Sequence, residues 1–318
     1  MADPKFSSQS ESVVNDLGPL AWVLGEVRTS LEASSKALKR FARDAAHTRG
    51  KDMASIDSSQ LRLAKQQLRQ VVGALEMVDL EKPALVLKAM ESTVERFVQS
   101  PELCSDAAAD TLEKAGFALT AYLEGMLAGR SASAVALFPQ YAEVQQLAGN
   151  ARIHPVDLWE VKWRWAAIAT PSAPALELDA AVKAQMDAPV LQVMRSFDTH
   201  AAQALKTLSA GLSLDSKASA HQQTLWRLAS AFFEAIEQKL LAADLYTKRT
   251  ITSVLLQANE QTKDPQAINT RLAQELLFFS AHAHEHPGSA SALNAALGAY
   301  GLAAYKSLDY SKRVFGHY

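Results

Sequence analysis

The chain has 318 residues, of which 48% are hydrophobic, and 32 Lys and Arg residues nearly balance 34 Asp and Glu residues, for a formal net charge of -2. This balance gives no electrostatic case for a nucleic-acid partner. The apolar runs fall short of the roughly 20 residues that cross a bilayer, and the N-terminus lacks a basic stretch leading into an apolar core. We therefore expect no secretory signal and no direct membrane insertion.

Helical periodicity dominates the first half of the chain. Residues 1–15 are polar and predict a tail. Apolar residues then recur at spacings of three and four over 19–44, 61–78, 83–97 and 105–126, with one or two short helices expected around Phe138. Within residues 16–150 this pattern predicts an antiparallel helical bundle.

Residues 151–178 have a different composition, with three tryptophans: Trp159, Trp163 and Trp165. The first two are four residues apart, so on a helix they would share a face. They could form an aromatic core between two domains or a partner-binding patch, since aromatic anchors dominate interface energy. Pro171 and Pro174 then make 170–178 the best candidate for a linker.

Residues 179–318 predict a second helical domain. Apolar stripes cover 190–208, 225–240, 251–258, 268–279 and 290–305, with Gly211 ending the first. No segment alternates with period two over a useful length, so the expected fold class is all-α. The last residues, SLDYSKRVFGHY, contain no helix cap, and we expect the chain to be cut from a longer protein.

One short motif in the first bundle resembles a known family. The run from Arg69 to Leu80, RQVVGALEMVDL, followed by a helix containing Met90-Glu91, resembles a histidine-phosphotransfer (HPt) domain. That family has a histidine, a lysine three residues later, a glycine directly after it, and a Met/Val-Gly-Leu corner. Gly73, Ala74, Met77-Val78 and Leu80 match this pattern. Arg69 replaces the histidine and Val72 replaces the lysine.

The replacement at Arg69 removes the chemistry of the motif. A histidine accepts a phosphoryl group on a neutral ring nitrogen, whereas a guanidinium stays protonated and has no acceptor. Arg69 could instead pair with the carboxylates of a receiver domain. The residues of this helix face that we expect to dock a receiver are Arg62, Gln66, Arg69 and Gly73. The alternative is an ordinary solvated helix face.

Longer stretches of the chain carry a second resemblance. The segments DLGPLAWVLGEVRTSLE, ALFPQY, ARIHPVDLW, LWRLASAFFEAI and NTRLAQELLFFSA resemble the N-terminal region of the chemosensory hybrid histidine kinases of type IV pilus systems (Chp/PilL type) and the related FimL family of twitching-motility scaffold proteins. The resemblance implies a degenerate HPt bundle and a scaffold domain in two-component signalling. Implied partners are a response-regulator receiver domain and polar pilus scaffold proteins, with recruitment to the cell pole or the inner-membrane face.

Other candidate sites are weaker. His282, His284 and His286 could bind metal on a helix, but Pro287 ends the helix there, so we predict no metal site. His200 lacks the lysine and glycine of the phosphotransfer motif, yet an active phosphocarrier using it is the alternative function. The single cysteine, Cys104, excludes an internal disulfide and favours the cytoplasm. No nucleotide loop is present, so we expect no cofactor and no catalytic activity in this region.

Overall fold

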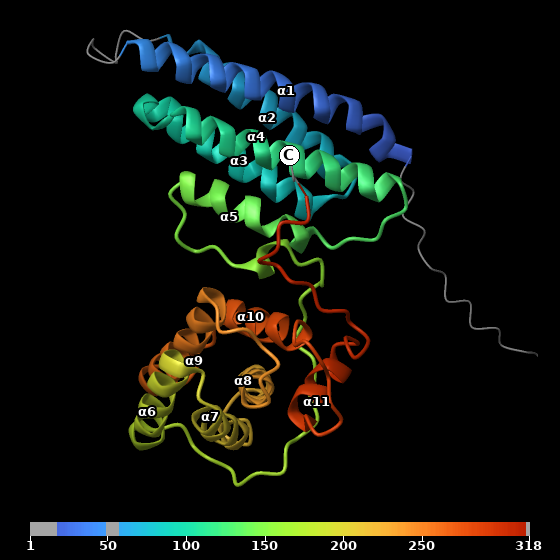
Figure 1. Cartoon of the computed structure of the whole chain (residues 1–318). Helices are drawn as coiled ribbons and strands as arrows, with labels where there is room; N and C mark the ends of the chain where they lie inside the picture. The colour runs from blue at the N-terminus through green and yellow to red at the C-terminus, as the bar shows by residue number, and fades with distance from the viewer. Residues whose placement is uncertain (1–17, 49–56, 316–318) are drawn as a thin grey trace, which may run out of the picture. The chain divides into compact units, whose positions relative to one another are not determined.

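A computed structural model describes residues 18–48 and 57–315 (Figure 1). All regular secondary structure within these ranges is helical, which confirms the predicted all-α class. The chain divides into two compact units. The first unit extends to Ile153 and also includes the segment from Lys312 onward, and the second unit is His154–Ser311. The chain therefore leaves the first unit once and returns to it near its C-terminal end.

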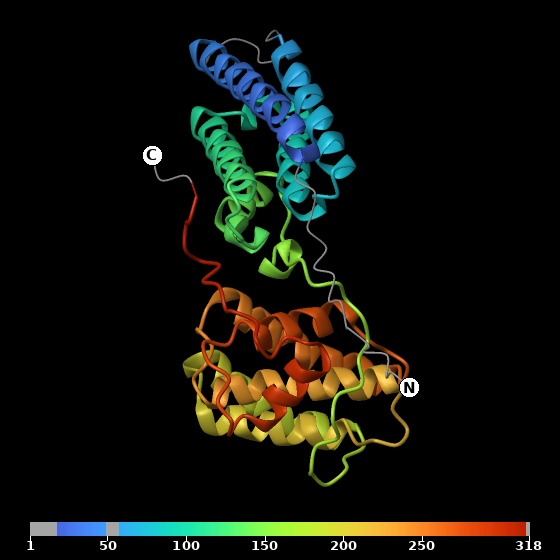
Figure 2. The same ribbon diagram turned by 90° about the vertical axis from the view of Figure 1, so that its right-hand side faces the viewer.

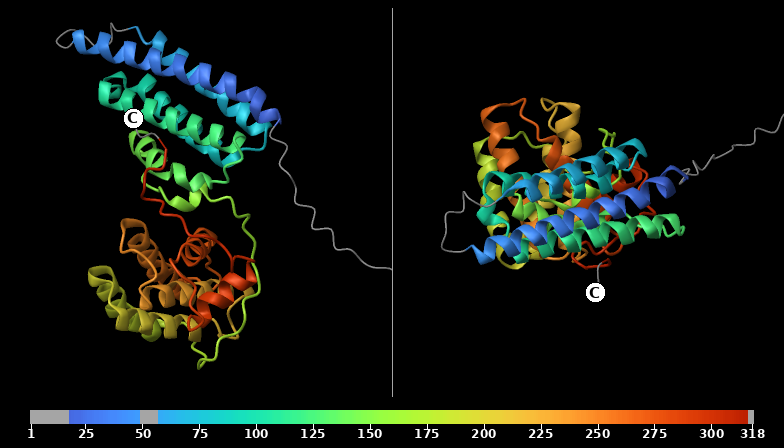
Figure 3. Two further views of the ribbon diagram at one scale, coloured as in Figure 1. Left: turned by 45° about the vertical axis from the view of Figure 1, so that its right-hand side comes forward. Right: turned by 90° about the horizontal axis from the view of Figure 1, so that it is seen from above.

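The first unit is built from five helices within the described residues. They are α1 (Gly18–His47), α2 (Ser59–Met77), α3 (Glu81–Gln99), α4 (Asp106–Leu127) and α5 (Phe138–Leu147), with short 3-10 turns at Pro101–Leu103 and Ala134–Leu137. Helix α1 packs against α2 and α4, α2 also packs against α3, and α5 lies against α3 and α4 (Figures 1 and 3). This arrangement surrounds one apolar core.

Helix α2 buries the stripe that its sequence predicts. Its fully buried side chains, each at 0% exposure, are Leu61, Ala64, Leu68, Val71 and Leu75. Complete burial of a leucine side chain stabilises a fold by about 1.5–3 kcal/mol. Apolar packing along this stripe therefore holds α2 in the bundle and leaves its opposite face available to solvent.

The corner between α2 and α3 has a defined geometry. Asp79 adopts a left-handed φ of 60°, the Leu80 N–H donates to the Leu75 carbonyl oxygen at 3.0 Å, and the Asp79 N–H donates to the Glu76 carbonyl oxygen at 3.1 Å. These are the hydrogen bonds of a Schellman motif, in which the left-handed position usually holds glycine. An aspartate therefore occupies a position suited to glycine.

The segment from Lys312 to Phe315 packs on the first unit. The Phe315 ring meets the Tyr122 ring edge-on at 5.7 Å, and the Phe315 carbonyl oxygen accepts a hydrogen bond of 2.8 Å from the Gln140 side chain. Arg313 forms an ion pair with Glu143. These residues belong to the predicted second domain, 179–318, because their partners on α4 and α5 are far away in the chain and no local pattern points to them.

The second unit is organised around α8 (Ala220–Glu237). The other helices are α6 (Ala180–Ser196), α7 (Thr199–Leu212), α9 (Leu245–Lys263), α10 (Thr270–Ala281) and α11 (Ser291–Ala299). Helices α7, α10 and α11 pack around α8, which Figure 1 shows end-on and Figure 2 shows lengthwise. Trp226, Phe232 and Phe233 of α8 are fully buried, as expected for a helix that is apolar on most sides.

The stripe over 190–208 predicted one helix, and this prediction is wrong. Phe197 adopts a left-handed φ of 53° and ends α6, and Asp198 caps α7 by accepting a 2.7 Å hydrogen bond from the Ala201 N–H. The apolar spacing continues across the break because both helices bury residues in the same unit. Asp198 was the local signal for a new helix start.

Candidate functional site

The candidate site lies on the solvent side of α2. Arg62, Gln66 and Arg69 are exposed and Gly73 is partly exposed, at spacings of four, three and four residues. Such spacings place side chains on one face of a helix. The structure therefore brings together all four residues that the sequence predicts for docking, on the side opposite the buried stripe.

Arg69 and Arg62 differ in what they contact. Arg62 donates a hydrogen bond of 2.8 Å to the Ser58 hydroxyl, which anchors it to the start of its own helix. Arg69 has no hydrogen bond or ion pair with any other residue that the structure describes. Its planar guanidinium therefore keeps its donors for an external carboxylate. Val72, at the lysine position of the motif, is 6% exposed and belongs to the core.

Gly73 borders a shallow depression on the surface. Its lining residues are Glu26, Arg69, Gln70, Gly73, Ala74, Glu76 and Met77. A Cβ atom added at Gly73 would meet nothing within 4 Å, so packing inside the protein does not require a glycine. A glycine inside a helix costs about 1 kcal/mol relative to alanine. The missing side chain keeps the depression open between α1 and α2.

The docking residues predicted from the sequence do not include three residues at or near this depression. The Glu26 carboxylate on α1 accepts a 3.0 Å hydrogen bond from the Gln70 side chain and so forms part of its wall. Met77 lines it and is 83% exposed, and Trp22, one turn before Glu26, is 90% exposed. Large exposed apolar side chains of this kind are common at interaction sites. Trp22 does not belong to the apolar stripe of α1. A large apolar residue outside the stripe was the sequence signal that could have predicted its exposure.

The three predicted tryptophans lie within the second unit, in a segment that contains no helix from 159 to 178. The expectation that Trp159 and Trp163 share a helix face is therefore wrong. Trp163 stacks on Tyr300 at 5.8 Å between ring centres, and Trp165 stacks on His221 at 4.7 Å. Trp159 is 4% exposed, so it packs inside this unit and has little surface for a partner.

Trp159 begins a chain of partly buried hydrogen bonds. Its indole N–H donates to the Tyr305 hydroxyl at 3.0 Å, and that hydroxyl lies 3.3 Å from Nε2 of His282. Nδ1 of His282 lies 2.8 Å from the Phe278 carbonyl oxygen, where it can donate. Burial lowers the pKa of His282 to about 4, so the imidazole is neutral near pH 7 and accepts from Tyr305. These hydrogen bonds connect Trp159 and Tyr305 to the C-terminal end of α10.

The remaining candidate residues are scattered. Helix α10 ends at Ala281, so the three histidines do not share a helix face. His282 is buried, His284 is exposed and His286 is partly exposed. Among the described residues, no group of three or more His, Cys, Asp or Glu side chains could hold a metal ion. His200 is exposed near the start of α7. Burial raises the pKa of the Cys104 thiol to about 12, in accord with a packing role.

Comparisons with known proteins bear on the second unit. Residues 171–313 match the family model described as FimL scaffold protein second domain. The match covers less than half of the chain and none of helices α1 to α5. Searches of curated proteins and of solved structures found no match. No helix in residues 18–48 and 57–315 is long and apolar enough to span a membrane.

Proposed function

We propose that the chain is a non-catalytic scaffold that acts by protein docking in the control of type IV pili and twitching motility. The observation that carries this proposal is the match of residues 171–313 to the second domain of FimL scaffold proteins. In this proposal the protein works in the cytoplasm and its partners, polar pilus scaffold proteins among them, recruit it to the cell pole. A closer relation to the Chp/PilL kinases stays a prediction.

The first unit acts, in this proposal, as a pseudo-HPt module that binds a response-regulator receiver domain without accepting a phosphoryl group. Three features support this role. Arg69 projects at the position of the phosphorylated histidine, Gly73 leaves open space beside it, and Asp79 has the left-handed conformation suited to the corner glycine of the HPt motif. The module would compete for receivers and would leave their phosphorylation unchanged.

Charge reversal at Arg69 tests the docking face. The full chain and its Arg69→Glu variant are titrated with the receiver domain of the type IV pilus chemosensory system of the same organism. Loss of a charge-assisted contact and repulsion from acidic receiver residues should weaken binding at least about tenfold. Because Arg69 has no partner among the described residues, the thermal melting temperature should stay unchanged.

Arg40→Glu is the matched control, since Arg40 is also exposed and lies fourteen residues beyond Glu26 along α1. Fourteen residues of helix correspond to about 21 Å. The control should bind the receiver like the parent protein. If the Arg69→Glu variant binds the receiver with the affinity of the parent protein, the proposed docking face is wrong. Acid-labile phosphate on His200 after incubation with phosphorylated receiver would establish the phosphocarrier alternative.

A further inference from the structure

A second hollow lies on the first unit, between α1 and α4, separate from the Gly73 depression. Its volume is about 390 Å³, within the range of roughly 300–1,000 Å³ that ligand pockets occupy. Its apolar lining residues are Leu31, Leu38, Met90, Leu112, Phe117 and Ala121. Gly116 also lines it, and a Cβ atom added there would lie 3.5 Å from the Leu31 side chain, in ordinary contact.

Ser34 lines this groove with a buried polar atom that lacks a partner. The residue is 2% exposed, and its hydroxyl oxygen has no hydrogen bond within the described structure. Buried hydroxyl groups in proteins are nearly always hydrogen-bonded, because an unmade bond costs free energy. A ligand with one polar group could satisfy this hydroxyl as donor or as acceptor.

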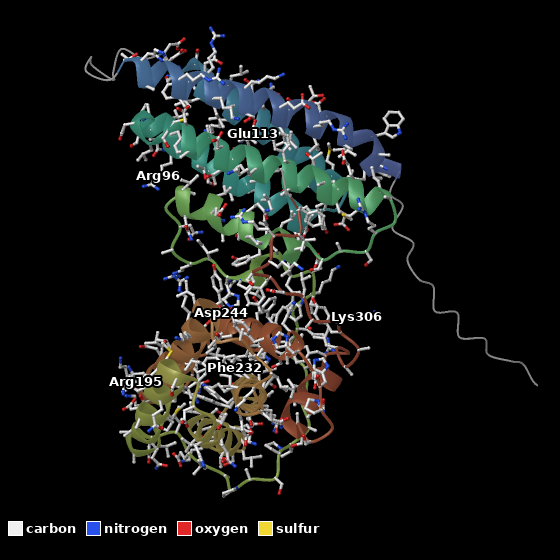
Figure 4. All side chains as sticks on the ribbon, in the orientation of Figure 1. Arg96, Glu113, Arg195, Phe232, Asp244 and Lys306 are labelled. Carbon is white, nitrogen blue, oxygen red and sulfur yellow. The ribbon has the colours of Figure 1, made fainter. Side chains whose placement is uncertain are left out.

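Two polar bridges between the helices close the groove at its ends. At one end Arg28 forms an ion pair with Glu124. At the other, Lys39 contacts the Glu113 carboxylate at 2.5 Å and the Ser35 hydroxyl donates to it at 2.9 Å (Glu113 is labelled in Figure 4). Seven residues of α1 separate Arg28 from Ser35, or about 10 Å. A polypeptide could not pass along the groove without breaking a bridge, which favours a small molecule.

The charges around the groove nearly cancel. The lining carries Arg28 and Lys36 together with the carboxylates of Glu32, Glu113 and Glu124. Just outside the lining, Lys39 pairs with both Glu113 and Asp110. An anion or a cation would therefore find no net attraction. The lining suits an uncharged molecule with an apolar body.

We propose that the α1–α4 groove binds a small, uncharged molecule with an apolar body and a single polar group that hydrogen-bonds to the Ser34 hydroxyl. The apolar body would lie on Leu31, Leu112 and Phe117, and the polar bridges at both ends limit its length. The site is independent of the receiver-docking face, so loss of one leaves the other intact.

The test uses 2-naphthol as the probe and naphthalene as the same body without the hydroxyl. Binding to the full chain is followed by NMR saturation transfer and by displacement titration. Ser34→Ala should weaken 2-naphthol binding by about two- to tenfold, the value of one neutral hydrogen bond, and should leave naphthalene unchanged. Gly116→Leu should abolish binding of both probes, because the new side chain fills the groove.

Gly298→Leu is the matched control, since Gly298 is exposed on α11 and its new side chain enters open space. It should bind both probes like the parent. If Gly116→Leu does not fold, as judged by circular dichroism, Ala121→Leu at the groove wall takes its place. The proposal is overturned if neither probe binds at millimolar concentration, or if a folded filling variant binds like the parent protein.

Discussion

The backbone N–H of Leu176 donates a hydrogen bond of 3.0 Å to the carbonyl oxygen of Gly211, which fastens the residues before α6 onto α7. A Cβ atom at Gly211 would lie 2.8 Å from side-chain carbons of Leu176 and 2.9 Å from the Pro174 carbonyl oxygen. The stretch 170–178, predicted as a linker, therefore packs closely against a helix of the second unit, and Gly211 permits this contact.

Replacement of this glycine should destabilise the protein. In Gly211→Ala the added methyl group collides with Leu176 and with a backbone oxygen that cannot move freely, an overpacking that costs about 1–3 kcal/mol. The free energy of unfolding from urea titration, monitored by tryptophan fluorescence, measures the effect. Unchanged stability would mean that the 170–178 segment does not pack on α7 in solution.

The opposite result is expected for the glycine of the docking face. Gly73→Ala should stabilise the protein by about 0.5–1 kcal/mol, because alanine favours the helix and its Cβ meets nothing within 4 Å. The same urea titration provides the comparison with Gly211→Ala. A destabilised Gly73→Ala variant would show that some part of the protein approaches α2 at this position.

The hydrogen-bond chain in the second unit predicts a cost for losing one hydroxyl. Tyr305→Phe leaves the buried Trp159 indole N–H and His282 Nε2 without their partner, and should destabilise the protein by about 1–3 kcal/mol. Tyr300→Phe is the control, since its hydroxyl accepts only a 3.4 Å bond from the Ala166 N–H. Equal stability losses in the two variants would argue against the chain.

The stability of the second unit should fall as the solution becomes acidic. His282 has a usual pKa of 6.5, which burial lowers to about 4 in the folded protein, so the unfolded state binds the proton first as pH falls. The free energy of unfolding should therefore decrease as pH falls from 6.5 to about 4, by up to about 3 kcal/mol in total. Burial also lowers the pKa of His154, which adds to the same trend.

Unfolding free energies measured between pH 7 and 4 check this dependence. His282→Gln lowers stability at neutral pH through lost packing, but it removes one titrating group, so its curve should be flatter than that of the parent. A variant curve parallel to the parent curve would assign the acid sensitivity to other residues.

Local patterns in the sequence were sufficient for much of the first unit. The stripe from Leu61 to Leu75 predicts the buried face of α2. It therefore also predicts that Arg69, on the opposite face, is exposed. Ser105, the first residue of the predicted 105–126 segment, caps α4 by accepting a 3.2 Å hydrogen bond from the Ala108 N–H. Periodicity and capping depend on neighbours in the chain, so a single sequence reveals them.

Features set by distant residues could not be predicted in this way. The partners of Trp159, Trp163 and Trp165 include Tyr305, Tyr300 and His221, which are 56 or more residues away. The same applies to Glu26 beside Gln70 in the candidate site, because the pairing of α1 with α2 fixes their proximity. Receiver docking, pilus control and the catalytic silence of the chain stay predictions.

The return of Lys312–Phe315 to α4 and α5 makes the second unit an insertion whose two ends are both held by the first unit. Truncating the chain after Ile153 and deleting the second unit internally would therefore have different effects on the first unit. A fragment ending at Ile153 would lose the contact of the Phe315 ring with Tyr122, whereas a deletion of His154–Ser311 that joins Ile153 to Lys312 by a flexible linker would retain it. Such a deletion variant would carry the receiver-docking face, the α1–α4 groove and the packed Lys312–Phe315 segment on a protein about half the size.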